Sequence, residues 1–182
     1  MKFIELTGQR IRLINPTEDY LDDIHEYSIM PQFYDYLEYP PFKNIDETKS
    51  FLLKLFKRSD DITGHYWFIY NISKNKVIGT IGLLDMDLRK GSAELTYGLS
   101  PNFWGKGFFS EALKLVTNWF FEQDNTHRLF VKTAGENINS INAVLRIGFK
   151  REGLLRDYYL DEKTQKREDA ILLSMLKSDI IN

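Results

Sequence analysis

The chain has 182 residues, of which 43% are hydrophobic and 27% are charged, with a net charge of −2 and no cysteine. This composition is normal for a soluble globular protein, and the length fits one domain, residues 1–182. The small net charge gives no electrostatic reason to expect nucleic acid or an anionic membrane as a partner. The lack of cysteine excludes disulfides, thiolate metal sites and a cysteine acyl-enzyme.

The N-terminal residues Met1 to Glu5 contain no apolar run of signal-peptide length and include an early acid. No stretch approaches the ~18 apolar residues of a membrane span. We therefore expect a cytoplasmic protein.

The first part of the chain predicts one strand and two helices. Residues 10–14 alternate polar and apolar side chains, as a strand does. Residues 15–18 break this strand and start a helix that runs to about Met30. Asn44 and Glu47 have the spacing of a capping box, so a second helix is expected from there to about residue 57.

The rest of the chain alternates strand and helix patterns. Three β-rich runs predict an antiparallel meander at residues 65–72, 77–84 and 93–99. Three-and-four spacing of apolar residues predicts an amphipathic helix from Phe108 to Phe120. A strand at 128–133, a helix from Asn137 to Gly148, and two strands at about 149–160 and 167–176 complete the order. This order, β-α-α-β-β-β-α-β-α-β-β, predicts an α/β (α+β) fold with a mixed sheet covered by helices.

Two glycines between a strand and the long helix predict an anion site. Gly105 and Gly107 let an anion approach the free backbone N–H groups at the helix start, and Lys106 adds a positive charge. A Walker A loop needs Ser or Thr where Gly107 stands, and a Rossmann fingerprint needs glycine where Ser110 stands. A turn shaped only by packing is the alternative that the spacing leaves open.

The segment from Trp104 to Ala112, Trp-Gly-Lys-Gly-Phe-Phe-Ser-Glu-Ala, resembles the pyrophosphate-binding loop of GNAT acetyltransferases. It is most similar to the branch of ribosomal-protein Nα-acetyltransferases (RimJ/RimL-like). The superfamily pattern is [QR]-x-x-G-x-[GA], from which Asn102 departs at the first position. The helix from Asn137 to Phe149 resembles the N-x-x-S-x-x-x-[VL]-x-x-x-G-F pattern of the same branch.

The resemblance spans about residues 8–177 and implies the GNAT fold, a twisted, mostly antiparallel sheet of about seven strands with about four helices. It implies acetyl-CoA as cosubstrate, with the pantetheine arm between two diverging strands, residues 93–99 and 128–133. The residues implied in cofactor binding are Tyr97, Gly98, Leu99, Trp104, Gly105, Lys106, Gly107, Phe108, Phe109, Ser110, Asn137 and Asn142.

The resemblance also implies direct acetyl transfer to a primary amine. Amines have pKa values of ~8 to ~10.4, so a base or a water chain must remove a proton at neutral pH. Glu94 is the candidate base, with a glutamate on a solvated strand face as the alternative. Many members use a tyrosine to protonate the leaving thiolate, but Val144 occupies that position here. Ser140 takes this role by analogy with the ribosomal-protein branch; the alternative is a small residue that admits the cofactor.

The segment between the first two helices borders the acceptor site in this fold. Tyr34, Tyr36 and Glu38 from this segment, and Tyr158 from the last hairpin, are therefore candidates for binding a cationic amine. Packing of these rings against the sheet is the alternative reading. Acceptor classes left open are a protein N-terminus, which we favour, a polyamine, an aminosugar nucleotide and an amino-acid-like toxin.

The sequence also bears on metal binding, assembly and functions other than catalysis. The spacing of His25, His65 and His127 is not typical of a metal site, so we expect no metal. A homodimer is compatible with the family, although the sequence offers no argument for an interface. A non-catalytic acyl-CoA-binding module and a nucleotide-binding protein that uses the same glycine turn remain as alternatives to an enzyme.

Overall fold

The computed structural model describes residues 4–60, 64–87 and 89–180, so both ends of the expected domain lie outside the described residues. Eight strands form one sheet in the order β1-β2-β3-β4-β5-β6-β8-β7. The strands are β1 (Leu6–Thr7), β2 (Ile11–Ile14), β3 (His65–Asn71), β4 (Lys76–Asp87), β5 (Ser92–Leu99), β6 (Arg128–Ala134), β7 (Lys150–Asp161) and β8 (Lys166–Leu176). The helices are α1 (Leu21–Ser28), α2 (Ile45–Asp60), α3 (Phe108–Glu122), α4 (Ile138–Arg146) and α5 (Lys177–Ile180), with short 3-10 helices η1 (Glu18–Tyr20), η2 (Pro31–Tyr34) and η3 (Pro101–Phe103).

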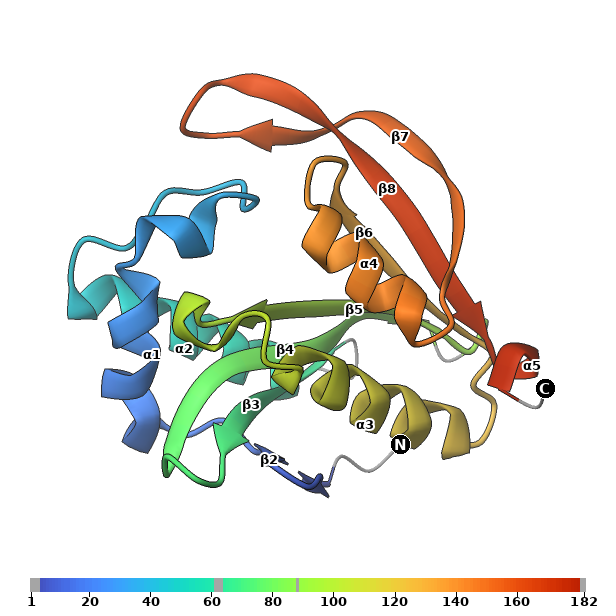
Figure 1. The fold of residues 1–182 in the computed structure, drawn as a ribbon, viewed down its shortest axis with the longest axis horizontal. Helices are drawn as coiled ribbons and strands as arrows, with labels where there is room; N and C mark the ends of the chain where they lie inside the picture. The colour runs from blue at the N-terminus through green and yellow to red at the C-terminus, as the bar shows by residue number, and fades with distance from the viewer. Residues whose placement is uncertain (1–3, 61–63, 88, 181–182) are drawn as a thin grey trace.

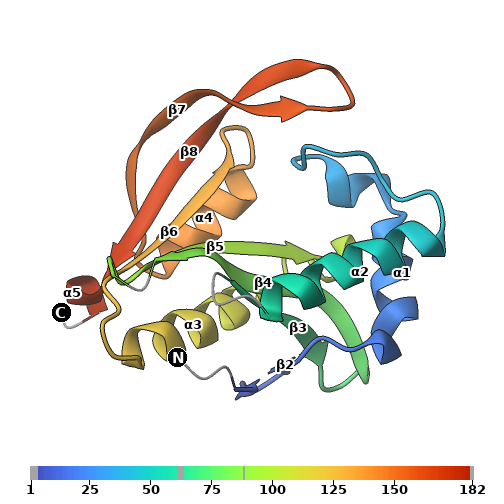
Figure 2. The same cartoon turned by 180° about the vertical axis from the view of Figure 1, so that it is seen from behind.

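Helices cover both faces of the sheet, α3 and α4 in front in Figure 1 and α2 in front in the reverse view of Figure 2. The alternation of β3 shows how two cores arise from one strand. Trp67 and Ile69 join the core under α3 and α4, whereas Tyr66 and Phe68 join the core under α1 and α2. The sheet is therefore buried on both faces and is a rigid frame for the segments at its edges.

The sheet splits between β5 and β6. These two strands are the one parallel pair among the described strands, and their ladder joins only Ser92, Ala93 and Glu94 to the segment Arg128–Phe130. Beyond Glu94, β5 continues along β4 and β6 continues along β8. Figure 1 shows the two strands diverging. This confirms the expected splay of these two strands.

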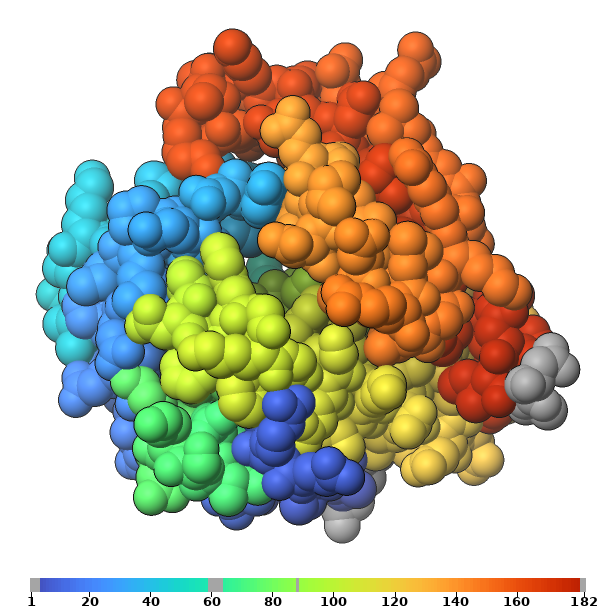
Figure 3. Space-filling view, viewed as in Figure 1, coloured from blue at the N-terminus to red at the C-terminus, as the bar shows by residue number. Residues whose placement is uncertain are grey.

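The tip of the β7–β8 hairpin is tied to the segment that follows η2. Lys163 Nζ donates to the carbonyl oxygens of Tyr34 at 2.6 Å and Leu37 at 3.0 Å, and Glu162 N donates to Glu38 O at 2.8 Å. In Figure 3 these two segments meet next to an opening beside the β6–α4 connection. Three hydrogen bonds thus hold the hairpin tip against the segment that follows η2.

The predicted element order is confirmed, with three additions or corrections. The strand β1 was missed because two residues are too short to show alternation. The single-turn helix α5 was also missed, and it brings the count to five α-helices among the described residues. The first helix ends at Ser28 rather than Met30, because a 3-10 turn begins at Pro31. The capping residues Asn44 and Asn137 are confirmed, since each side chain accepts a backbone N–H bond at its helix start.

Close approach of β4 and β5 depends on Gly79. A Cβ at this position would lie 2.3 Å from Gly98 O and 3.0 Å from the Cα of Leu99. We expect Gly79→Ala to lower the free energy of unfolding by about 1–3 kcal/mol, because two backbones must separate. Urea denaturation measures this change. Gly153→Ala is the matched control, since a Cβ there meets nothing within 4 Å; equal midpoints for the two variants would contradict the prediction.

Candidate active site

The glycine turn before α3 presents backbone N–H groups to solvent. Gly105 and Gly107 have φ angles of +70° and +80°, a conformation that favours glycine. The first α3 backbone bond runs from Glu111 N to Gly107 O at 3.2 Å, so residues 108–110 have no acceptor within the helix. A Cβ at Gly105 would meet nothing within 4 Å, so the turn is open there. This is the geometry of an anion-binding helix start.

Two polar side chains of the turn are bonded within it. The indole Nε1 of Trp104 donates to Leu99 O at 2.7 Å, while the ring stays 43% exposed. Lys106 Nζ donates to Asn102 O at 2.7 Å. In this structure the Lys106 ammonium therefore bridges back to the start of the turn, whereas the sequence suggested that its charge adds to the anion site.

Three hydroxyl groups meet at the split between β5 and β6. Ser140 Oγ, on α4, lies 2.7 Å from the hydroxyl of Tyr97 and 3.2 Å from Oγ1 of Thr133. Ser140 N also donates to Asn137 Oδ1 at 3.1 Å, which fixes the first turn of α4. Burial raises the pKa of Tyr97 above its ordinary value, against a smaller opposite effect of the bond to Ser140. The Tyr97 hydroxyl is therefore protonated at neutral pH.

Apolar side chains pack beside the Tyr97 ring and at the start of α3. The ring of Phe109, from the first turn of α3, lies 4.3 Å from the ring of Tyr97. The ring of Phe108 contacts that of Phe103 at 5.9 Å. Val144 is fully buried in the core under α3 and α4, so the position at which the family resemblance leads one to look for a tyrosine is part of the packing here.

The side chain of Glu94 lies on the face of the sheet opposite to that of Tyr97, because successive side chains of a strand alternate between the two faces. Its carboxylate Oε2 forms an ion pair with Lys132 Nζ at 2.7 Å, and the two side chains are only 15% and 17% exposed. Lys132 also donates to the hydroxyl of Tyr158. Burial raises the pKa of Glu94 although the bond and charge of Lys132 act against it. Glu94 is therefore not the solvated glutamate that the alternative reading described.

The residues around this ion pair come from three segments. Tyr158 lies in a register shift of β7 between Leu155 and Tyr159, which turns its ring over Lys132 at 4.9 Å. Burial and the charge of Glu94 raise the pKa of Tyr159. Burial and the charge of Glu162 raise the pKa of Glu38, which Lys132 lowers. Tyr158 thus contacts the ion pair directly, and Glu38 lies within electrostatic reach of Lys132.

Tyr34 is not placed to bind an acceptor. Its side chain is 1% exposed and its hydroxyl donates to Ser28 O at 2.7 Å. Its ring packs against Phe33, Tyr39 and Phe42. This corrects the expectation for Tyr34, because a buried and bonded phenol is part of the segment's own packing. Tyr36 is exposed on the same segment, with no ring contact to this cluster among the described contacts.

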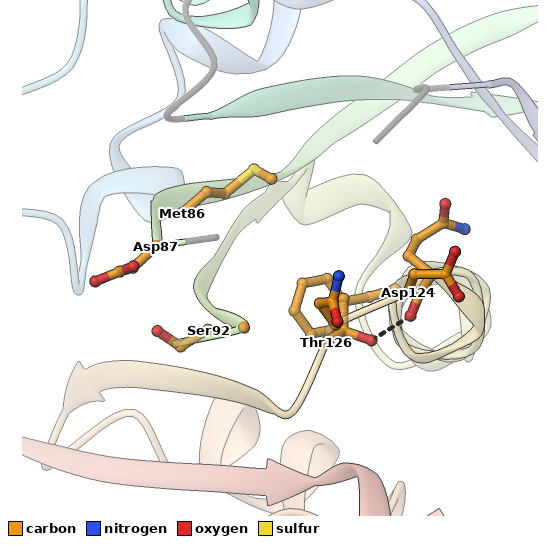
Figure 4. A pocket seen from close by; sticks show the side chains of 9 residues that line it. Met86, Asp87, Ser92, Asp124 and Thr126 are labelled. Carbon is orange, nitrogen blue, oxygen red and sulfur yellow. Dashed lines mark hydrogen bonds between the residues drawn. The ribbon is translucent and has the colours of Figure 1, made fainter. Parts of the chain in front are cut away.

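The structure has two cavities that bear on the site. One, of about 520 Å³, is lined by Asn142, Leu145 and Arg146 on the outer side of α4 and contains one of the predicted cofactor residues. The other, of about 270 Å³, lies between the start of β5 and the end of α3. Figure 4 shows it with Met86, Asp87 and Ser92 on one side and Thr126, which donates to Gln123 O, on the other. None of the predicted site residues lines this second cavity.

Sequence reasoning missed Lys132 and Thr133. The alternating burial of β6 was visible as a pattern, but which partners those side chains meet depends on strands distant in sequence. A lysine inside a strand that is otherwise rich in apolar residues was the available signal, since a half-buried lysine needs an anionic partner.

Within residues 4–60, 64–87 and 89–180, no group of three or more His, Cys, Asp or Glu side chains is placed to hold a metal ion. In the same ranges, no helix is long and apolar enough to cross a membrane.

Comparison with known proteins identifies the family. Residues 10–150 match the family model described as an acetyltransferase (GNAT) domain. An uncharacterized N-acetyltransferase, p20, from Bacillus licheniformis is 31% identical over 96% of this chain and 97% of its own length. Spermidine N(1)-acetyltransferase from Vibrio cholerae is 23% identical over 78% of this chain and 79% of its own length.

Solved structures agree with this match at the level of the fold. A ribosomal L7/L12 alpha-N-protein acetyltransferase (RimL), solved in complex with coenzyme A, superposes with a TM-score of 0.85 at 15% identity, over 95% of this chain and 98% of that chain. The fold is therefore the GNAT fold. With its open mixed sheet, its GNAT domain and an N-acetyltransferase relative along almost its whole length, the chain belongs to the GNAT family and is an acetyl-CoA-dependent N-acyltransferase.

Proposed function

We propose that this enzyme transfers the acetyl group of acetyl-CoA directly to a primary amine, with a protein or peptide N-terminus as the favoured acceptor. The observation that carries the proposal is the split between β5 and β6. The hydroxyl cluster of Ser140 lies on the α3 and α4 side of this split, and the Glu94–Lys132 pair lies on the other side. The cofactor and the amine therefore meet at the split from opposite faces.

In this proposal the N–H groups from Gly105 to Ser110 bind the pyrophosphate of acetyl-CoA. The pantetheine arm lies along β5 at Tyr97, Gly98 and Leu99, where β6 no longer pairs with the strand. The cavity beside Asn142 receives the nucleotide end. The half-exposed ring of Trp104 and the rings of Phe108 and Phe109 flank this path.

The hydroxyl cluster suits the protonation of the leaving thiolate. A serine hydroxyl has one proton to donate and two lone pairs that accept. When Tyr97 and Thr133 both donate to Ser140 Oγ, both lone pairs are occupied, and the serine proton is free to reach a third group. We infer that this third group is the sulfur of the departing coenzyme A.

Glu94 is the base in this scheme, directly or through a water molecule. Its raised pKa increases its basicity, while Lys132 keeps the carboxylate charged at neutral pH. The N–H of the β5 backbone near Leu99 would stabilise the oxyanion.

The charge balance of the acceptor side favours an acceptor with one cationic group. Glu94 is already neutralised by Lys132, and Lys132 would repel a second ammonium group close to it. A polyamine is the second candidate, since Glu38 and Glu162 are two carboxylates within electrostatic reach of each other at the hairpin tip. The α-amino group of a peptide carries its single positive charge at the reacting nitrogen, so its binding requires neither Glu38 nor Glu162.

Incubation with acetyl-CoA and an amine panel tests the acceptor class, with release of free thiol followed by a chromogenic reagent. The panel contains peptides with different N-termini, spermidine, aminosugar nucleotides and amino acids. We expect kcat/KM for the best peptide to exceed that for spermidine by at least about tenfold, because Lys132 disfavours a polycation. A preference for spermidine that is lost in Glu38→Gln and kept in the exposed control Glu18→Gln would favour the polyamine instead.

Glu94→Gln is expected to lower kcat/KM by about 10² or more, because the amine loses its base. The pH profile separates this from a packing defect. As pH falls, the wild-type rate declines once because the amine gains a proton, and again as pH passes down through the raised pKa of Glu94. The Gln variant keeps only the first decline. Lys132→Met is expected to move the second decline to higher pH, because the carboxylate loses its cation; an unchanged profile in both variants would rule out Glu94 as the base.

Ser140→Ala is expected to lower kcat by about 10² with acetyl-CoA affinity kept within a few-fold, because the thiolate loses its proton donor. Tyr97→Phe and Thr133→Val each remove one hydrogen-bond donor to Ser140. Each variant should lower kcat by about 5–10-fold, which corresponds to the free energy of about one hydrogen bond. Steady-state kinetics measures both effects. If Tyr97→Phe leaves kcat unchanged while Ser140→Ala abolishes it, the orientation of the serine proton does not depend on this cluster.

A further inference from the structure

The side chain of Arg10 joins the two ends of the glycine turn. Its Nη1 donates to Lys106 O at 2.8 Å, and its Nε donates to Glu111 Oε2 at 2.9 Å. The backbone N–H of Arg10 donates to the other oxygen of the same carboxylate, also at 2.9 Å. The guanidinium lies 4.7 Å from the ring centroid of Phe108. One side chain from the residue before β2 thus contacts the middle of the turn and the first turn of α3.

The carboxylate of Glu111 creates an electrostatic problem for an anion site. Glu111 lies in the first turn of α3, next to the N–H groups that would bind a pyrophosphate, and its side chain is largely buried. Burial raises the pKa of Glu111, but the hydrogen bonds and charge of Arg10 outweigh it and hold the pKa below the usual value. Glu111 is therefore negative at neutral pH, and without Arg10 it would repel a phosphate bound to the same helix start.

Arg10 also fixes which way the turn faces. Because Lys106 O is held by the guanidinium, this carbonyl dipole points toward Arg10 and away from the open side of the turn. A Cβ at Gly107 would lie 3.2 Å from Arg10 Nη2, so the guanidinium lies directly against the glycine backbone. Among the described ion pairs it is Arg10 that contacts Glu111, whereas the Lys106 ammonium donates to Asn102 O.

The backbone around Arg10 is held by the sheet. Ile72 N donates to Arg10 O at 3.1 Å, and Gly8 N donates to Ile11 O at 2.9 Å. A Cβ at Gly8 would lie 2.5 Å from Glu111 Oε1, so the chain at Gly8 passes close to the same carboxylate. The guanidinium therefore projects from a fixed frame onto the turn.

We propose that Arg10 is a positioning residue for the pyrophosphate of acetyl-CoA: it neutralises Glu111 and orients the glycine turn so that the N–H groups face the anion. This inference rests on the proposed role of residues 105–110 in binding the pyrophosphate. It adds a residue about a hundred positions away in the chain, outside the glycine motif.

Calorimetric titration with CoA and with pantetheine, which lacks the pyrophosphate and nucleotide, tests the proposal on the full chain. We expect Arg10→Gln to raise the Kd for CoA by about tenfold or more and to change the Kd for pantetheine by less than about twofold. Arg10→Lys should recover only part of the affinity, because a lysine keeps the charge but loses the guanidinium fork. Arg12→Gln is the matched control, since Arg12 lies two residues further along the chain, on β2, and its guanidinium stacks on Tyr70; it should leave both Kd values unchanged.

The double variant Arg10→Gln/Glu111→Gln distinguishes two effects of losing Arg10: repulsion of the pyrophosphate by the Glu111 carboxylate, and loss of the orientation of the glycine turn. If Arg10 acts by neutralising Glu111, removing the carboxylate should restore at least about a third of the lost affinity on a logarithmic scale. The inference is overturned if Arg10→Gln binds CoA as the wild type does, or if it loses CoA and pantetheine affinity in equal proportion. A wild-type protein that binds CoA no more tightly than pantetheine would instead refute the proposed role of the glycine turn.

Discussion

The split of the sheet after Glu94 is the constraint on which the rest of the site depends. Backbone N–H and C=O groups in a protein interior need partners, and a strand that loses its neighbour leaves a row of them open. Here β6 turns away with β8 while β5 stays on β4, so the open row of β5 faces a gap rather than solvent. A ligand with an extended, hydrogen-bonding arm completes such a gap better than a side chain does, which is why a pantetheine arm fits the proposal.

Ion pairs balance two carboxylates of the proposed site. Arg10 neutralises Glu111 at the start of α3, and Lys132 neutralises Glu94 beside the split. Both carboxylates are largely withdrawn from solvent, where an unpaired charge is costly. In the proposed mechanism, the first pair lets the glycine turn bind an anion, and the second pair keeps Glu94 charged so that it can accept a proton from the amine.

The features predictable from the sequence were those with local causes. Asn137 caps α4 and the glycines at 105 and 107 take positive φ because these preferences act within a few residues. The contacts of Lys132 and Arg10 were not predictable, since their partners lie 38 and 101 positions away and depend on sheet register. The prediction that Tyr34 binds the acceptor was wrong for the same reason. Only the folded segment shows that the Tyr34 ring is buried and that its hydroxyl donates to Ser28 O.

A set of hydrogen bonds to backbone carbonyls joins the hairpin tip to the η2 segment on the proposed acceptor side. The hairpin tip is tied to the η2 segment by three hydrogen bonds, two of them from Lys163 to backbone carbonyls. Backbone acceptors make this tie independent of the side chains of that segment, so the closure is a property of the fold of both segments. In the proposed scheme the acceptor reaches Glu94 on this side of the sheet, so the tie limits how far the hairpin and the η2 segment can separate to admit it. A narrow, extended chain end is for this reason the acceptor that the proposal favours over a lysine on a folded surface.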